Sequence, residues 1–386
     1  MRLSAEFAID KREPWVAEHN KEVVEVMDAY RNDRPIRVPL ILGEWAGQHG
    51  FYMDEFDLDY RDYYNDPDEM LRVQLESAKR KRELPWSDMI LGEAPESWPV
   101  SVDLWPVVAP GAFGCELAYR PGAVIAHRAM ALGIDECKSL SMPDVFSGGI
   151  LAKVYEFYHY LKDAYENKLF FLGAPVKRIA GGAGTNGVFS LSLDLRGPDI
   201  MADMYEDPEF AAGFLERLAN WIDELETKWD EMCGVPVRPF STSDHGIDML
   251  SAELYEKFLV PIVIRHNRLR GTEASTHFHH CGRGVHLFDT VRRRFGIDSM
   301  NALTYPTLDI ERVRSIAGEE AWLTCLIEGA VLQYGTEQQI ADAVRGVMKA
   351  KGKGRFAIMA GDMLRGVPAK NMEVLYEAVR AYGKYD

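Results

Sequence analysis

The chain has 386 residues, of which 47% are hydrophobic and 27% charged, and 60 acidic residues outnumber 44 lysines and arginines. This composition is typical of a folded protein with a large core, and the net charge of −16 argues against a nucleic acid as partner. Five cysteines without a CxxC pair favour reduced thiols over a disulfide framework. With no signal-peptide pattern and no run of apolar residues long enough to span a bilayer, we expect a cytoplasmic protein with no membrane partner.

The first half of the chain shows helix and strand patterns in an irregular order. Apolar residues recur at helical spacing over residues 15–31, and an apolar run at 36–43 predicts a strand. Two helices should begin at Asp66-Pro67 and Asp207-Pro208, where aspartate is the N-cap and proline the first helical residue. Between them we expect strand candidates at 104–109, 122–126 and 169–173, a helix at 149–166, and a loop rich in glycine and proline over 174–190.

From residue 235 onward, strands and helices alternate regularly. The expected strands are 236–243, 274–281, 297–302, 320–328 and 355–360, and the expected helices are 251–269, 284–294, 308–315, 336–350 and 368–383. Thr336 and Gln339 form a capping box at the start of one of these helices. Such alternation requires parallel strands joined by crossover helices.

When only one of the candidates at 122–126 and 169–173 is counted, the whole chain offers eight strands, the number in a (β/α)8 barrel. No glycine-rich nucleotide-binding motif follows the first strand, which disfavours a dinucleotide-binding or P-loop fold. We therefore predict an α/β protein with a (β/α)8 TIM barrel. Residues 1–386 should form a single domain, with a helical N-terminal extension over residues 1–35.

The densest group of potential metal ligands lies in the stretch from Thr276 to Gly282, with the sequence THFHHCG. At the end of a strand, the period of two places His277, His279 and Cys281 on one face. Imidazole and thiolate are preferred ligands of Zn²⁺, which takes three or four protein ligands. Such residues are also common as hydrogen-bonded core residues, and we expect that role for His277.

The active site of a TIM barrel lies at the C-terminal ends of the strands, so polar residues that close each strand are candidates for it. In chain order these are Glu44, His49, Asp244, His245, His279, Cys281, Asn301, Glu328 and Asp362. Surface loops are commonly polar, so a single polar residue indicates little, whereas convergence of these residues at one end of a barrel indicates a site. We predict a zinc site formed by His279, Cys281 and Asp362, with Glu328 as a fourth ligand or as a partner that orients a histidine.

Short motifs along the second half of the chain carry a resemblance to a known family. They are Leu195-Arg196-Gly197, residues 204–209, residues 250–255, His279 to Gly282, residues 334–340, and Gly361 with Asn371. With these motifs the chain resembles the uroporphyrinogen decarboxylase superfamily, and in particular its branch of zinc-dependent, corrinoid-linked methyltransferases.

The resemblance implies a set of metal ligands. In the methyltransferase branch a His-x-Cys pair and a later cysteine bind the zinc that activates an acceptor thiol. His279 and Cys281 match the pair, and Asp362 stands where the later cysteine would fall. The arginine-bearing segment with which the decarboxylases bind porphyrinogen carboxylates is not apparent, because Glu44-Trp45-Ala46-Gly47 stands there instead.

The resemblance also implies a reaction. We expect a methyltransferase that uses zinc to move a methyl group between a corrinoid, such as methylcobalamin as co-substrate, and a small acceptor such as a thiol or a folate. Asp244, His245 and Glu328 would carry protons or orient ligands. The substrate pocket would be lined by Glu44, Trp45, His49 and Asn301.

A corrinoid protein is expected as partner, and a homodimer as the assembly. Two alternatives stay open. One is a metal-free decarboxylase that uses Asp244 or Glu44, and the other is a non-catalytic barrel that binds a corrinoid or tetrapyrrole.

Overall fold

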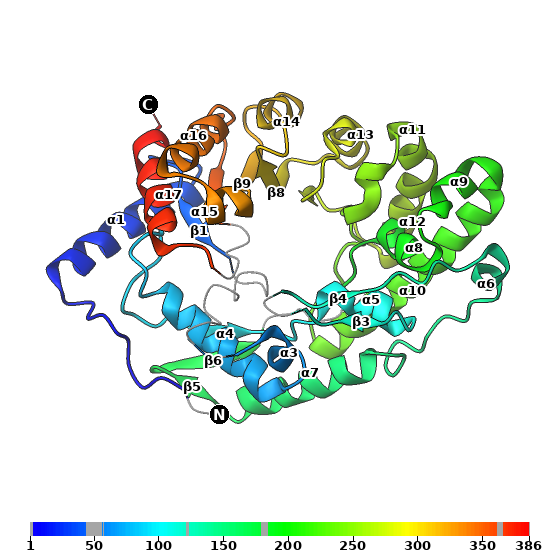
Figure 1. The fold of residues 1–386 in the computed structure, drawn as a ribbon, viewed down its shortest axis with the longest axis horizontal. Coiled ribbons are helices and arrows are strands. Elements are labelled where there is room, and N and C mark those ends of the chain that lie inside the picture. The colour runs from blue at the N-terminus through cyan, green and yellow to red at the C-terminus, as the bar shows by residue number, and fades with distance from the viewer. Residues whose placement is uncertain are drawn as a thin grey trace.

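Figure 1 shows the computed structural model, in which helices form an outer ring and strands lie on its inner side. The structure describes residues 3–43, 56, 58–120, 123–178, 184–360 and 366–385. The first helix α1 (Pro14–Arg31) and the last helix α17 (Ala369–Tyr382) lie side by side (Figure 1), joined by an ion pair between Arg380 and Glu22. Within the described ranges no helix combines the length and apolar character needed to cross a membrane.

A five-stranded parallel sheet organises the second half of the chain. Its order is β1 (Leu40–Leu42), β10 (Phe356–Ala360), β9 (Trp322–Ile327), β8 (Ser299–Tyr305) and β7 (His277–His279). The strands expected at 297–302, 320–328 and 355–360 are confirmed, and β1 from the start of the chain pairs with β10 from its end. The strand expected at 274–281 ends at His279, so Cys281 lies beyond it.

Three helices between these strands agree with the sequence. They are α13 (Val285–Phe295), α14 (Ile310–Ala317) and α16 (Glu337–Met348), the last of which begins with the capping box of Thr336 and Gln339. A further short helix, α15 (Gly329–Tyr334), was not predicted. The helix expected at 251–269 is divided into α11 (Ala252–Leu254), a π-helical turn η3 (Tyr255–Leu259) and α12 (Val260–Arg270). Pro261, which has no N–H group to continue the ladder, stands at the start of α12.

The long helices of the first half begin where the sequence indicates. Asp66 caps α4 (Pro67–Lys81) and Asp207 caps α10 (Pro208–Cys233), each through its side chain. Helix α7 (Leu151–Glu166) is also as expected. The further helices are α3 (Tyr60–Tyr63), α6 (Ile134–Ser139), α8 (Val188–Arg196), α9 (Asp199–Glu206) and the short 3₁₀ helix η2 (His245–Met249).

The strand predictions in the first half are wrong in several places. The run at 104–109 forms a 3₁₀ turn, η1 (Trp105–Val107), and helix α5 (Val108–Ala112), whose five residues are all buried. A short run that is apolar on every side fits a buried helix as well as a buried strand, so periodicity cannot separate the two. The strand that belongs here is β2 (Trp98–Val100), a few residues earlier.

Two further candidates belong to antiparallel hairpins. The strand expected at 122–126 is β4 (Ala126–His127), whose one ladder among the described residues is with β3 (Leu117–Ala118). In the 169–173 candidate, β5 (Phe170–Phe171) turns back onto β6 (Ala174–Arg178), and β6 pairs in parallel with β2. The loop expected over 174–190 is therefore wrong, because it contains β6 and the start of α8.

The run at 236–243 lies next to β7 but forms no ladder with it. Instead the side chain of Asn267 both accepts a hydrogen bond from the Phe240 N–H group and donates one to the Phe240 carbonyl, each at 3.0 Å. The ladders among the described residues thus form the five-stranded parallel sheet, a three-stranded sheet β2-β6-β5 and a hairpin. The fold is α/β with a central parallel sheet, and the described ladders do not close into an eight-stranded ring.

Candidate metal centre

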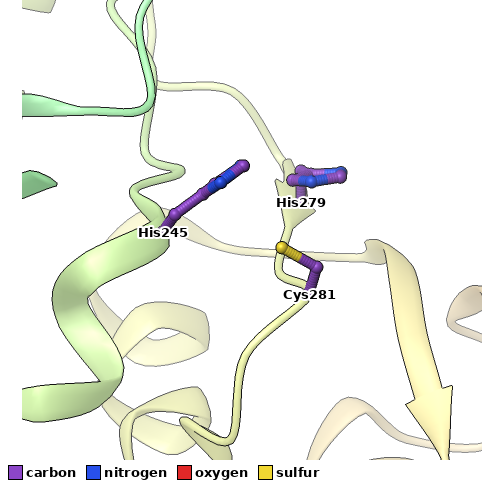
Figure 2. Close-up of side chains that lie close together, drawn as sticks. All are labelled: His245, His279 and Cys281. Carbon is purple, nitrogen blue, oxygen red and sulfur yellow. The ribbon is translucent and has the colours of Figure 1, made fainter. Parts of the chain in front are cut away.

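Three potential metal ligands meet at the C-terminal edge of the sheet. They are His245, His279 and Cys281, whose ligand atoms all lie within 4.8 Å of one another. Figure 2 shows that they come from two separate segments: His245 from η2, and the other two from the end of β7 and the loop after it. The two histidines are half-buried and the cysteine is exposed. No other group of three such residues is found in the part of the chain that the structure describes.

The alternation along β7 explains how His279 reaches this position. Phe278 and His280 are fully buried on one face, where their rings stack at 5.6 Å and both meet the edge of Phe288. His277 and His279 therefore lie on the opposite face, as the period of two predicts. Burial lowers the pKa of His280 to about 4, and its Nε2 accepts a hydrogen bond from the Gly284 N–H group at 2.9 Å.

The loop after β7 turns tightly and brings Cys281 back beside His279. Its backbone lies so close to neighbouring side chains that a Cβ atom on Gly282 would be 2.7 Å from a carboxylate oxygen of Asp248. The same carboxylate oxygen accepts a hydrogen bond from the Arg283 N–H group at 3.1 Å. A side chain at this position would therefore require the carboxylate of Asp248 to shift.

His279 is held by hydrogen bonds at both its backbone and its ring. Its N–H group donates to Ser243 Oγ at 2.9 Å, and its Nδ1 lies 2.9 Å from Asn301 Oδ1. Burial, with a smaller contribution from the neighbouring His245, lowers the pKa of His279 to about 4. The imidazole is therefore neutral at neutral pH, which is the form that binds a metal.

His245 packs against both His279 and Trp105. Its ring stacks on that of His279 with centroids 5.4 Å apart and meets the edge of Trp105 at 6.1 Å. Burial also lowers its pKa. The sequence indicates a catalytic role for His245 and places Trp105 inside a strand. It therefore does not identify His245 as a potential metal ligand, or Trp105 as the residue that packs against it.

Asp244, the other predicted catalytic residue in this segment, is a buried hydrogen-bond acceptor. Its carboxylate accepts from the N–H groups of Phe189, Ser190 and Gly246 and from the Ser190 hydroxyl, at 2.6–3.1 Å. Burial raises the pKa of Asp244 to about 6, and these hydrogen bonds oppose the increase. A Cβ atom on Gly187 would collide with the same carboxyl group. Asp244 thus ties the N-terminus of α8 to the start of η2, next to His245.

Asn301 was predicted to bind substrate, and in the structure it contacts His279. The two residues are directly paired in the β7–β8 ladder. Asn301 lies within a register shift of β8 relative to β9, between Met300 and Leu303, and Ala302 next to it is in the left-handed region at φ 60°. Bulges and left-handed residues of this kind are enriched beside functional sites.

The remaining predicted residues lie elsewhere. Glu328 is a half-buried residue at the N-cap of α15 and is not part of the three-residue donor group. His277 is hydrogen-bonded to Ser299 as expected, but it is exposed rather than in the core. Residues Glu44, Trp45, His49 and Asp362 lie outside the described residues.

Asp103 is a strand-end residue that sequence reasoning missed. It is buried three residues after the end of β2, where Tyr63 donates a hydrogen bond to its carboxylate at 2.8 Å. Burial raises the pKa of Asp103 to about 6. The rule of examining strand ends would have selected this residue if the strand had been placed at 98–100 instead of 104–109.

The donor group fits a zinc ion with small movements. In tetrahedral zinc sites the metal lies about 2.0–2.1 Å from nitrogen and about 2.3 Å from sulfur, which places neighbouring donor atoms about 3.3–3.6 Å apart. Atoms already within 4.8 Å of one another need to move by about 1 Å, a distance that side-chain rotations supply. Two neutral imidazoles and one thiolate are a suitable donor set, and they leave one position of a tetrahedron for a substrate.

Comparison with known proteins gives two findings. The model of the family Uroporphyrinogen decarboxylase (URO-D) matches residues 24–382. Among solved structures, a methyltransferase from Methanosarcina mazei matches with a TM-score of 0.61 at 14% identity, and the match covers 93% of this chain and 98% of that chain. No curated protein matches the sequence. At this level of identity the structural likeness establishes a shared fold.

Proposed function

The chain belongs to the uroporphyrinogen decarboxylase family, and on this premise we propose that it is a methyltransferase with a zinc site at the C-terminal edge of its sheet. It would move a methyl group between a corrinoid and a small acceptor such as a thiol or a folate. The observation that carries the proposal is the convergence of His245, His279 and Cys281. The similarity in fold to a methyltransferase supports it.

In this proposal the two imidazoles and the Cys281 thiolate hold the metal. When bound, zinc would act as a Lewis acid that lowers the pKa of an acceptor thiol, so that the acceptor binds as a thiolate. His245 is thereby moved from proton carrier to ligand. Asp362 keeps its predicted role as a ligand in this proposal, in the fourth position that the acceptor would take over when it binds.

The chain's own residues would position the acceptor. Trp105, whose ring meets that of His245, would form a wall beside the donor group, and the loop at Gly282 would hold Cys281. The acceptor sulfur would supply the electron pair for its new bond to the methyl carbon. The pair from the broken carbon–cobalt bond would stay with the corrinoid, so the transfer requires no external oxidant or reductant.

The test is elemental analysis of the purified, untagged protein beside its site variants. We expect about one zinc per chain in the wild type, and loss of zinc in Cys281→Ala and His245→Gln. Cys233→Ala and His159→Gln are matched controls at distant helices and should keep the metal. Methyl transfer from methylcobalamin to thiols and folates, followed by the cobalamin absorbance, should fall by at least about a hundredfold in the two site variants.

The opposite result is equally clear. A wild-type protein that binds no zinc after reconstitution, or site variants that keep it, would contradict the metal centre. Release of CO₂ from a carboxylated tetrapyrrole by the metal-free protein would then identify a decarboxylase. Tight binding of a corrinoid without turnover of any acceptor would identify a non-catalytic barrel.

A further inference from the structure

Two successive pairs in the β7–β8 ladder have the same geometry but different chemistry. His277 is paired with Ser299, and His279 with Asn301. In both pairs the imidazole Nδ1 contacts the side chain opposite, at 2.8 Å from the serine hydroxyl and 2.9 Å from the asparagine carbonyl oxygen. Only the second histidine belongs to the donor group.

The partner at Nδ1 determines which ring nitrogen carries the proton, and Asn301, which also hydrogen-bonds the ring of His277, is the Nδ1 partner of His279. A serine hydroxyl can donate or accept, so it is compatible with either neutral form of His277. An amide oxygen can only accept, so Nδ1 of His279 must be the donor. The proton then resides on Nδ1, and the lone pair that can bind a metal is on Nε2.

Three further contacts make this arrangement rigid. Ser243 accepts a hydrogen bond from the backbone of His279, and the stacked ring of His245 limits rotation of the imidazole. The backbone N–H group of His280 also donates to the carbonyl of Asn301 at 3.2 Å. Asn301 is therefore joined to this strand end through both its main chain and its side chain.

We propose that Asn301 is a positioning residue that fixes His279 in the Nδ1-protonated form and so directs Nε2 toward the metal. This inference deepens the proposed function and rests on it for the identity of the metal. The tautomer of His279 is a property of the metal-free protein and can be measured without it. The role expected from the sequence, contact with substrate, is replaced by contact with a ligand.

The first experiment reads the tautomer directly. The ¹⁵N spectrum of metal-free protein labelled at histidine nitrogens, with the signals assigned through His279→Gln, distinguishes a protonated from an unprotonated Nδ1. We expect Nδ1 of His279 to be protonated in the wild type and in Asn301→Asp, which keeps an acceptor at the same place. In Asn301→Ala the ring should relax to a mixture of both forms, whereas Ser299→Ala should leave it unchanged.

The second experiment measures zinc affinity by competition with a chromophoric chelator. Loss of a group that orients a ligand commonly weakens binding by about 10- to 100-fold, and we expect that loss for Asn301→Ala. Ser299→Ala, one pair away in the same ladder, should stay within about threefold of the wild type. Asn301→Asp should bind zinc at least as tightly as the wild type, because a carboxylate raises the basicity of the ring.

The two experiments test the role of Asn301 separately from the identity of the metal. A wild-type His279 protonated on Nε2, a tautomer that Asn301→Ala does not change, or equal zinc affinities for Asn301→Ala and Ser299→Ala would overturn the proposal. If the wild type shows the expected tautomer but binds no zinc, the failure falls on the proposed function, and the tautomer assignment stands.

Discussion

Asp244 and His245 are neighbours in the chain, but they belong to two regions that use polar groups in different ways. In the first region, called the rear region here, the carboxylate of Asp244 is buried and accepts four hydrogen bonds that join α8 to η2. In the second, the front region, His245, His279 and Cys281 bring ligand atoms together at a partly exposed sheet edge. The comparison indicates that the rear region stabilises the fold and that the front region is available for binding.

The largest expected effect is on stability, from Asp244→Ala. The substitution would leave three buried donors without their acceptor, because the Gly246 N–H group also donates to Ser190 Oγ at 2.8 Å. Removing one partner from such a network costs about 3–5 kcal/mol. The free energy of unfolding of the metal-free protein, measured in urea, should decrease by this amount. A decrease below about 1 kcal/mol would show that water replaces the carboxylate, and the rear region could no longer be called a structural support.

A second buried carboxyl group, that of Asp103, accepts fewer hydrogen bonds than Asp244, so it shows the effect of burial more directly. Asp103 accepts one hydrogen bond from a side chain, that of Tyr63, and its pKa is raised from 3.8 to about 6 by burial. Between pH 4 and pH 6 the folded protein therefore keeps a proton that the unfolded chain releases. The contribution of this residue to stability is present below pH 4 and is lost as the pH rises through 6, by up to about 3 kcal/mol.

The test is the pH dependence of urea unfolding for the wild type and Asp103→Asn. Asparagine cannot ionise but keeps an oxygen that accepts the Tyr63 hydroxyl, so the variant should lose this part of the slope between pH 4 and pH 6. Asp244, which remains in both proteins, contributes equally to both curves. Identical slopes would mean that the Asp103 carboxyl group is solvated like an ordinary surface aspartate.

A metal should stabilise the protein through the front region alone. Zinc that binds only the folded state adds about 2.7 kcal/mol to the free energy of unfolding at a concentration one hundred times its Kd. The thermal midpoint should therefore increase with zinc in the wild type, but not in Cys281→Ala. An equal increase in both proteins would place the zinc elsewhere, and Cys233→Ala controls for general effects of removing a thiol.

The sequence predicts these two regions unequally. The strand that ends at His279 and the alternating faces of Phe278 and His280 follow from the period of two, and the capped helices follow from Asp66, Asp207 and Thr336. These features depend on residues close together in the chain. They are therefore visible before any fold is known.

The donor His245 and the anchor at Asp244 depend on contacts that are distant in sequence. The ring of His245 meets that of His279, 34 residues later, and Asp244 meets Ser190, 54 residues earlier. No local pattern contains that information. The same holds for β2, whose three residues are recognisable only from their pairing with β6.

The smallest expected effect on stability is from His245→Ala in the metal-free protein. The substitution removes a half-buried ring whose main contacts are with His279 and Trp105, and such changes usually cost less than about 1 kcal/mol. The same variant should lose zinc, so a large effect on binding would accompany a small effect on unfolding. Asp244→Ala, one residue earlier, should instead cause a large decrease in the free energy of unfolding. If both variants destabilise the metal-free protein equally, the ring of His245 is part of the core, and the separation of a supporting region from a binding region fails.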